Sequence, residues 1–164
     1  MNRGAVKQRD NQRITDIALD EHTILRRSPE IEHERRVAIF DLLEENHFDP
    51  LGVAPGPYHL HLAIEDNRLV LDIRAEDESA LARVVFPVSP LRRLIKDYFH
   101  VCESYFDAIK RASPSRIEAI DMGRRGLHNE GSEVLRDRLA DRIDIDIDTA
   151  RRLFTLICVL HIRG

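Results

Sequence analysis

The sequence predicts an α+β fold, with a small antiparallel sheet of three to four strands packed against about five helices. Two patterns carry this prediction. Ser-Pro pairs at residues 28–29, 89–90 and 113–114 each precede apolar residues at helical spacing, and two segments near residues 58–73 alternate with a period of two. A chain of 164 residues that is 43% hydrophobic and 33% charged suits one domain.

The three Ser-Pro pairs mark helix starts, because serine can cap the first free amides and proline fits the first helical position. We expect one helix over residues 29–46 and a strongly amphipathic second helix over residues 90–111. A third helix should begin at Pro114 and be interrupted near residues 123–131, where three glycines occur, and a fourth should begin after Ser132.

The last predicted helix, Thr149–Ile162, is apolar on most sides and could be capped by Asp148. Such a helix is either central to the core or half of an oligomer interface. The segment before it alternates Asp with Ile143, Ile145 and Ile147, which indicates an extended connector, because the glycine and the terminal glutamate of a calcium loop are absent.

The sheet is predicted around a hairpin of residues 58–64 and 69–73, with Asp66-Asn67 at the turn. A two-residue turn sets the register and puts apolar residues opposite each other on one face. The predicted pairs are Ile64 with Leu69, Leu62 with Leu71, and Leu60 with Ile73. Residues 13–19 and 81–88 are further strands, and Pro87 indicates a strand end or an edge.

Residues 1–12 are polar and basic and are predicted to form a flexible tail before a single α+β domain over residues 13–164. No apolar run approaches the roughly 20 residues of a membrane helix, so we expect no membrane partner and a cytoplasmic location. The net charge of −4 makes nucleic acid an unlikely partner. Cys102 and Cys158 are read as small buried hydrophobes, and no cofactor is expected.

His59 and His61 form the first candidate site. Residues two apart on a strand share a face, so both imidazoles could reach one metal ion, with Asp72 across the hairpin orienting His61. A third ligand would have to come from elsewhere in the fold. The alternative is a polar, solvent-facing sheet surface with an ordinary His–Asp pair.

The second candidate site is the stretch IEAIDMGRRGLHNEG, residues 117–131, which is dense in charged side chains between three glycines. The proposed binding surface centres on this stretch and is joined by an arginine pair from an earlier segment. Its residues are Arg124, Arg125, His128, Asn129, Glu130, Arg92 and Arg93. As an alternative, a metal ion could be held by Glu118, Asp121, His128 and Glu130. The structural alternative is a helix–loop–helix corner held by Arg–carboxylate pairs.

Five segments together resemble a bacterial family. They are HERRVAIFDLLEEN, GPYHLHL, RRLIKDYFHVCESY, IEAIDMGRRGLHNEG and DTARRLFTLICVLH. They are similar to the uncharacterised protein family 0262 of the UPF series, and the resemblance covers nearly the whole chain except the basic tail. The family has no established activity, so the resemblance implies no catalytic residues.

Two functions remain open at this point. The first is a non-catalytic interaction or regulatory domain whose Arg- and His-rich surface binds a small anion or a protein partner, in a homo-oligomer formed through Thr149–Ile162. The second is a metal-dependent or acid/base enzyme acting on a small anionic, phosphorylated substrate. The enzyme hypothesis requires His128 and at least two carboxylates in one pocket.

Overall fold

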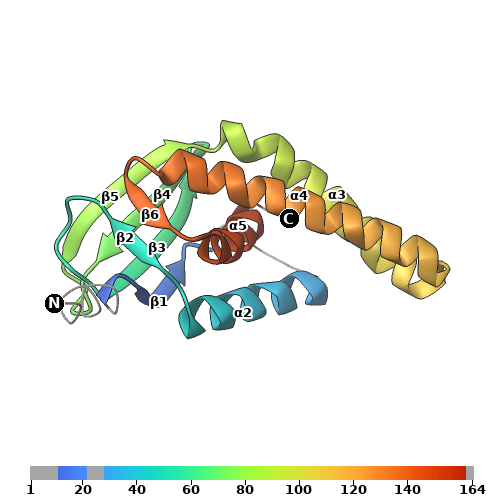
Figure 1. The fold of residues 1–164 in the computed structure, drawn as a ribbon, viewed down its shortest axis with the longest axis horizontal. Helices are drawn as coiled ribbons and strands as arrows, with labels where there is room; N and C mark the ends of the chain where they lie inside the picture. The colour runs from blue at the N-terminus through green and yellow to red at the C-terminus, as the bar shows by residue number, and fades with distance from the viewer. Residues whose placement is uncertain (1–10, 22–27, 162–164) are drawn as a thin grey trace, which may run out of the picture.

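The computed structural model describes residues 11–21 and 28–161 and confirms the α+β fold (Figure 1). The helices described are α2 (Pro29–Glu44), α3 (Ser89–Arg111), α4 (Pro114–Leu139) and α5 (Ile147–His161). One sheet contains β1 (Ile14–Leu19), β3 (Tyr58–Glu65), β4 (Arg68–Arg74) and β5 (Ala80–Pro87), and a smaller sheet contains β2 (Phe48–Pro50) and β6 (Ile143–Ile145). Helix α5 lies at the centre, between α2 and the long α3–α4 hairpin (Figure 1).

The predicted hairpin is confirmed in its register. Strand β3 pairs with β4 so that Ile64 faces Leu69, and the two further predicted apolar pairs follow along the ladder. Asp66 and Asn67 both have positive φ, 51° and 61°, as a two-residue turn of type I′ requires. Strand β5 ends at Pro87 and forms one edge of the sheet, as that proline indicates.

The sheet is mixed, however, and the prediction of a purely antiparallel sheet is wrong. Strand β1 runs parallel to β3, because the chain passes through α2 and β2 before it returns to the sheet. The small β2–β6 sheet was not predicted, because strands of three residues are too short to show a period. Ile143 and Ile145 are extended as expected, but Ile147 is the first residue of α5.

All three Ser-Pro pairs lie at helix starts, but only two of the serines act as caps. The Ser28 and Ser113 hydroxyls accept hydrogen bonds from the third backbone amide after each of them, at 3.2 and 3.4 Å. Ser89 lies inside α3. For α5, the capping carboxylate belongs to Asp146, which accepts from the backbone amide of Thr149 at 2.9 Å; the prediction of Asp148 as cap is wrong.

Helix α4 is continuous over 26 residues, so the predicted interruption near residues 123–131 and the separate helix after Ser132 are wrong. The glycines are accommodated within the helix because packing against α3 and α5 outweighs their low helix propensity. Gly131 has a specific role: a Cβ atom at this position would overlap the ring of Phe154 on α5. Its lack of a side chain therefore lets the two helices approach closely.

The core is centred on α5, which is the first of the two positions that the sequence allowed for this helix. Its apolar side chains are buried within the single chain, including Leu153, Phe154 and Ile157, so the helix is central to the core. Cys102 and Cys158 are free and buried, as expected. Among the residues described, no helix has the length and apolarity needed to cross a membrane.

The predicted tail falls almost wholly outside the described residues, as does Ile162 at the end of the last predicted helix. Of the tail, only positions 11 and 12 are described. The carbonyl of Gln12 accepts a hydrogen bond from the backbone amide of Phe48 at 2.8 Å, so contacts with the domain have begun by this residue.

Candidate functional site

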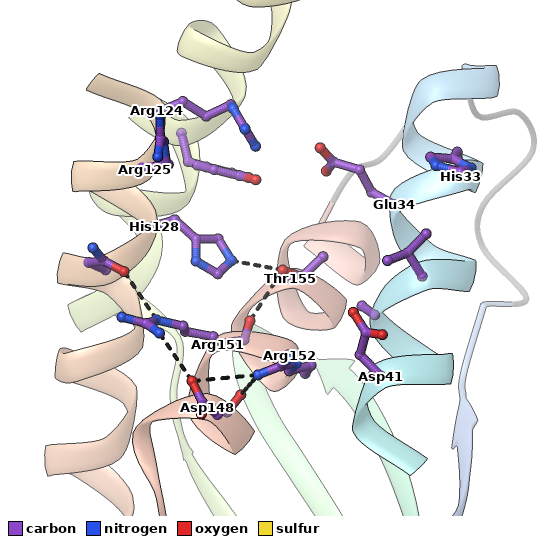
Figure 2. A pocket seen from close by; sticks show the side chains of 14 residues that line it. His33, Glu34, Asp41, Arg124, Arg125, His128, Asp148, Arg151, Arg152 and Thr155 are labelled. Carbon is purple, nitrogen blue, oxygen red and sulfur yellow. Dashed lines mark hydrogen bonds and ion pairs between the residues drawn. The ribbon is translucent and has the colours of Figure 1, made fainter. Parts of the chain in front are cut away.

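A pocket of about 560 Å³ opens between α2, α4 and α5, with one side chain from α3 at its base. Its lining consists of His33, Glu34, Val37, Ala38, Asp41, Tyr98, Arg124, Arg125, His128, Asn129, Asp148, Arg151, Arg152 and Thr155. Figure 2 shows the arginines on the α4 and α5 side and the acidic side chains Glu34 and Asp41 on the α2 side. The pocket therefore has a cationic wall and an acidic wall.

On α4, Asp121 holds the two neighbouring arginines. Its carboxylate lies 2.6 Å from Arg124 Nη2 and 2.7 Å from Arg125 Nη2, at the helical spacings of three and four residues. Hydrogen bonds to Arg124, the largest cause, lower the pKa of Asp121, so this carboxylate is ionised at neutral pH. Arg125 remains 65% exposed, which leaves most of its donors available to a ligand.

On α5, Asp148 has the same role. It lies 3.0 Å from Arg151 Nη1 and 3.6 Å from Arg152 Nη1, and Asn129 of α4 accepts a further hydrogen bond from Arg151 at 3.1 Å. Within the part of the chain that the structure describes, the four guanidinium groups of the cationic wall form ion pairs with two carboxylates, so this wall has an excess of positive charge.

His128 is held in one orientation at the centre of the pocket. Its ring lies against Tyr98 and Phe154, with centroid distances of 5.3 and 5.4 Å, and its Nε2 atom lies 2.8 Å from Thr155 Oγ1. The Thr155 hydroxyl donates its proton to the carbonyl of Arg151, so it accepts from Nε2–H of His128. Nδ1 is then the ring nitrogen without a proton.

The histidine contributes no positive charge at neutral pH. Burial, followed by the charges of Arg124, Arg151 and Arg152, lowers the pKa of His128 to about 4. Any attraction of this wall for an anion therefore comes from the arginines.

The acidic wall differs from the cationic wall because, within the described residues, its carboxylates accept no hydrogen bond and form no ion pair. No described side chain forms a hydrogen bond or ion pair with Glu34 or Asp41. Burial raises the pKa of Glu34, and the nearby charges of Arg124 and His33 oppose that rise without cancelling it. Glu34 is therefore a half-buried acid next to the space that a ligand would occupy.

The structure brings together four of the seven predicted binding residues: Arg124, Arg125, His128 and Asn129. The other three lie on exposed surfaces and are not among the described lining residues. Glu130 faces solvent on α4, Arg92 is exposed on α3, and Arg93 lies 3.8 Å from Asp97 with its side chain 93% exposed.

The predicted metal alternatives are not grouped as ligands. Glu118 and Glu130 are exposed on α4, and Asp121 is engaged by two arginines. In the part of the chain that the structure describes, no three or more His, Cys, Asp or Glu side chains form a group that could hold a metal ion.

The two hairpin histidines do share a face, but their common partner is Glu78 in the β4–β5 turn. Its carboxylate accepts from His59 Nδ1 at 2.6 Å and from His61 Nε2 at 3.0 Å. Asp72 lies opposite His61 in the ladder but binds Arg74 at 2.8 Å, so the predicted orienting role of Asp72 is wrong. We call His59, His61 and Glu78 the strand cluster.

The prediction missed the α2 and α5 sides of the pocket. Glu34, Ala38 and Asp41 are spaced by four and three residues, so they share one helix face. Two acidic residues flanking a buried alanine on that face are a detectable sign of an acidic wall. The Arg151-Arg152 pair is equally visible, but only the fold shows that it faces α4.

The fold and the pocket define an α+β protein in which three helices enclose a charged pocket beside a mixed sheet. The chain belongs to UPF0262, an uncharacterised protein family whose model matches residues 11–163, which confirms the resemblance seen in the sequence.

Several members are closely similar to this chain. A UPF0262 protein of Paramagnetospirillum magneticum is 61% identical over 93% of this chain and 98% of its own length. One from Rhizobium etli is 58% identical over 93% of this chain and 96% of its own, and one from Rhodospirillum rubrum is 57% identical over the full length of both. No solved structure matches the chain.

Proposed function

We propose that this protein is a non-catalytic, regulatory binding module. The pocket between α2, α4 and α5, which we call the helix pocket, binds a small anion in this proposal. The observation that carries the proposal is the convergence of four guanidinium groups from α4 and α5 on one pocket, with an excess of positive charge on that wall. Guanidinium groups bind carboxylates and phosphates through two parallel hydrogen bonds.

The shape of the site favours a small molecule over a flat protein surface. A volume of about 560 Å³ lies within the roughly 300–1,000 Å³ typical of small-molecule sites. Asn129 and Thr155 add neutral polar groups, and Val37 and Ala38 add an apolar patch on α2. This mixture of a few placed polar groups and apolar surface is typical of a ligand pocket.

The test is calorimetric titration of the full chain with inorganic phosphate and with acetate. Arg125→Gln and Arg151→Gln should each weaken binding by about tenfold or more, because hydrogen bonds to charged groups are worth roughly 1.5–3 kcal/mol. Arg93→Gln is the matched control, since this arginine is exposed on α3 and lies outside the lining. If Arg93→Gln weakens binding and Arg125→Gln does not, the site is elsewhere.

A second candidate function, acid/base catalysis on a small anionic substrate, is favoured by one observation. Glu34, whose pKa is raised, and His128, whose pKa is lowered, line the same pocket, and opposed shifts of this kind are common at catalytic sites. Assays against a panel of phosphate and carboxylate esters would test it: turnover that both Glu34→Gln and His128→Gln abolish would replace the binding proposal with catalysis.

The homo-oligomer and the cytoplasmic location stay predictions. Burial of the apolar face of α5 inside the chain means that an oligomer would have to use another surface or the end of that helix.

A further inference from the structure

We propose that the ligand of the helix pocket is a zwitterion, whose anionic group faces the arginines and whose cationic amine faces Glu34 and Asp41. This inference rests on the proposed function, since it uses the same pocket and specifies the chemical class of the ligand.

The first step is the separation of charge across the pocket. In Figure 2, Arg124 and Arg125 extend from α4 and Arg151 from α5, while Glu34 and Asp41 extend from α2 toward the space between the helices. An anion alone would gain from the first wall but would also meet the field of two carboxylates. A molecule that carries both charges is complementary to both walls.

The second step is the difference in how the two walls are satisfied. Each arginine of the cationic wall has a carboxylate or a carbonyl partner within the protein, which holds it in place. Among the described residues, Glu34 and Asp41 have no such partner. Within the described residues, these two carboxylates therefore lack a hydrogen-bond donor, and an amine supplies up to three.

The third step is burial. A carboxylate that loses water without gaining a hydrogen bond is costly, and such groups in folded proteins call for an explanation. Glu34 is in this position, and burial is the largest cause of its raised pKa. A bound ammonium group would offset the cost at Glu34.

Matched pairs of probes test the proposal on the full chain. 2-Aminoethyl phosphate is compared with ethyl phosphate, and 4-aminobutyrate with butyrate, each by calorimetric titration at neutral pH. We expect the aminated member of at least one pair to bind about tenfold more tightly or better, because a charged hydrogen bond to a half-buried carboxylate is strong.

Glu34→Gln should remove this preference and should tighten the binding of ethyl phosphate, because it deletes a negative charge that repels the anion and keeps the shape of the side chain. Glu130→Gln is the matched control, as this glutamate is exposed on α4 outside the lining. Urea unfolding of each variant shows whether it is folded, and Asp41→Asn provides an independent second variant.

The outcomes separate the two proposals. Equal affinity within each pair of probes overturns the zwitterion and leaves the anion pocket intact. A preference for the amine that both Glu34→Gln and Asp41→Asn retain also overturns it. If none of the four probes binds, the proposed function itself is contradicted. Tight binding of ethylamine, which has no anionic group, overturns both proposals.

Discussion

The helix pocket and the strand cluster contain the same kinds of side chain in opposite states. In the strand cluster, the carboxylate of Glu78 takes a hydrogen bond from each of two histidines on the outer face of the hairpin. In the helix pocket, His128 is locked among rings and a hydroxyl, and Glu34 has no partner among the described residues. One group is satisfied on the surface, and the other is incomplete and half-buried.

This difference distinguishes polar side chains that only support the fold from polar side chains that could bind a ligand. A satisfied, exposed cluster needs no ligand to explain it, and its contribution to stability is small. A half-buried carboxylate that lacks a hydrogen-bond donor beside fixed arginines lowers the stability of the fold, and a ligand could supply that donor. The following predictions probe how far the two regions differ, beginning with the packing beneath the pocket.

The largest expected effect is that of Gly131→Ala. A Cβ at this position would overlap the Phe154 ring, which itself contacts His128, so α4 and α5 would have to separate. Overpacking at such a contact costs roughly 1–3 kcal/mol, and we expect a loss near the upper end. Urea unfolding followed by circular dichroism measures it.

Gly126→Ala is the control within the same helix. Nothing described lies within 4 Å of a Cβ at this position, so alanine should stabilise the helix by roughly 0.5–1 kcal/mol. A similar loss at both glycines would mean that α4 is not continuous here, and the pocket built on it would have another shape.

The next effect is the pH dependence that His128 imposes. Its folded pKa of about 4 lies below the unfolded value of 6.5, so the unfolded chain takes up this proton first as the pH falls. Stability should therefore decrease between pH 6.5 and 4, by up to about 3 kcal/mol for this group. Unfolding curves across this range measure the decrease.

His128→Gln should flatten the profile in this window, because it removes the group whose proton the unfolded chain takes up first. Parallel profiles for the wild type and His128→Gln would show that the ring is solvated, and the contrast with the strand cluster would disappear.

The fold was predictable where local chemistry decides it. Proline fixes the helix starts at residues 29, 90 and 114, and the turn at Asp66-Asn67 fixes the hairpin register. The continuity of α4 was not predictable. Glycines in a sequence usually indicate a helix break, and only the fold shows that Gly131 leaves room for the ring of Phe154, which is 23 residues away in the sequence. The parallel pairing of β1 with β3 requires a crossover connection between the two strands, and no local sequence pattern indicates it.

The candidate site was predictable only along one helix. Charge density on α4 identified Arg124, Arg125 and His128, since these residues are neighbours in sequence. The acidic wall on α2 is about 90 residues earlier, and a single sequence contains no signal that pairs it with α4. The sequence also does not show which charged side chains of α4 line the pocket. Glu130 follows the lining residue Asn129 directly but faces solvent.

The smallest expected effect is that of Glu78→Gln in the strand cluster. Hydrogen bonds from His59, the larger cause, and His61 lower the pKa of Glu78, so its stabilising contribution is present above the unfolded pKa and is lost as the pH falls through the folded pKa. The carboxylate is exposed, so solvent screens this contribution. Thermal unfolding should show a slight decrease in stability at pH 7 that becomes smaller as the pH falls, with anion binding in the pocket unchanged. A loss comparable to that of Gly131→Ala, or any loss of anion binding, would show that the strand cluster is coupled to the pocket through the sheet.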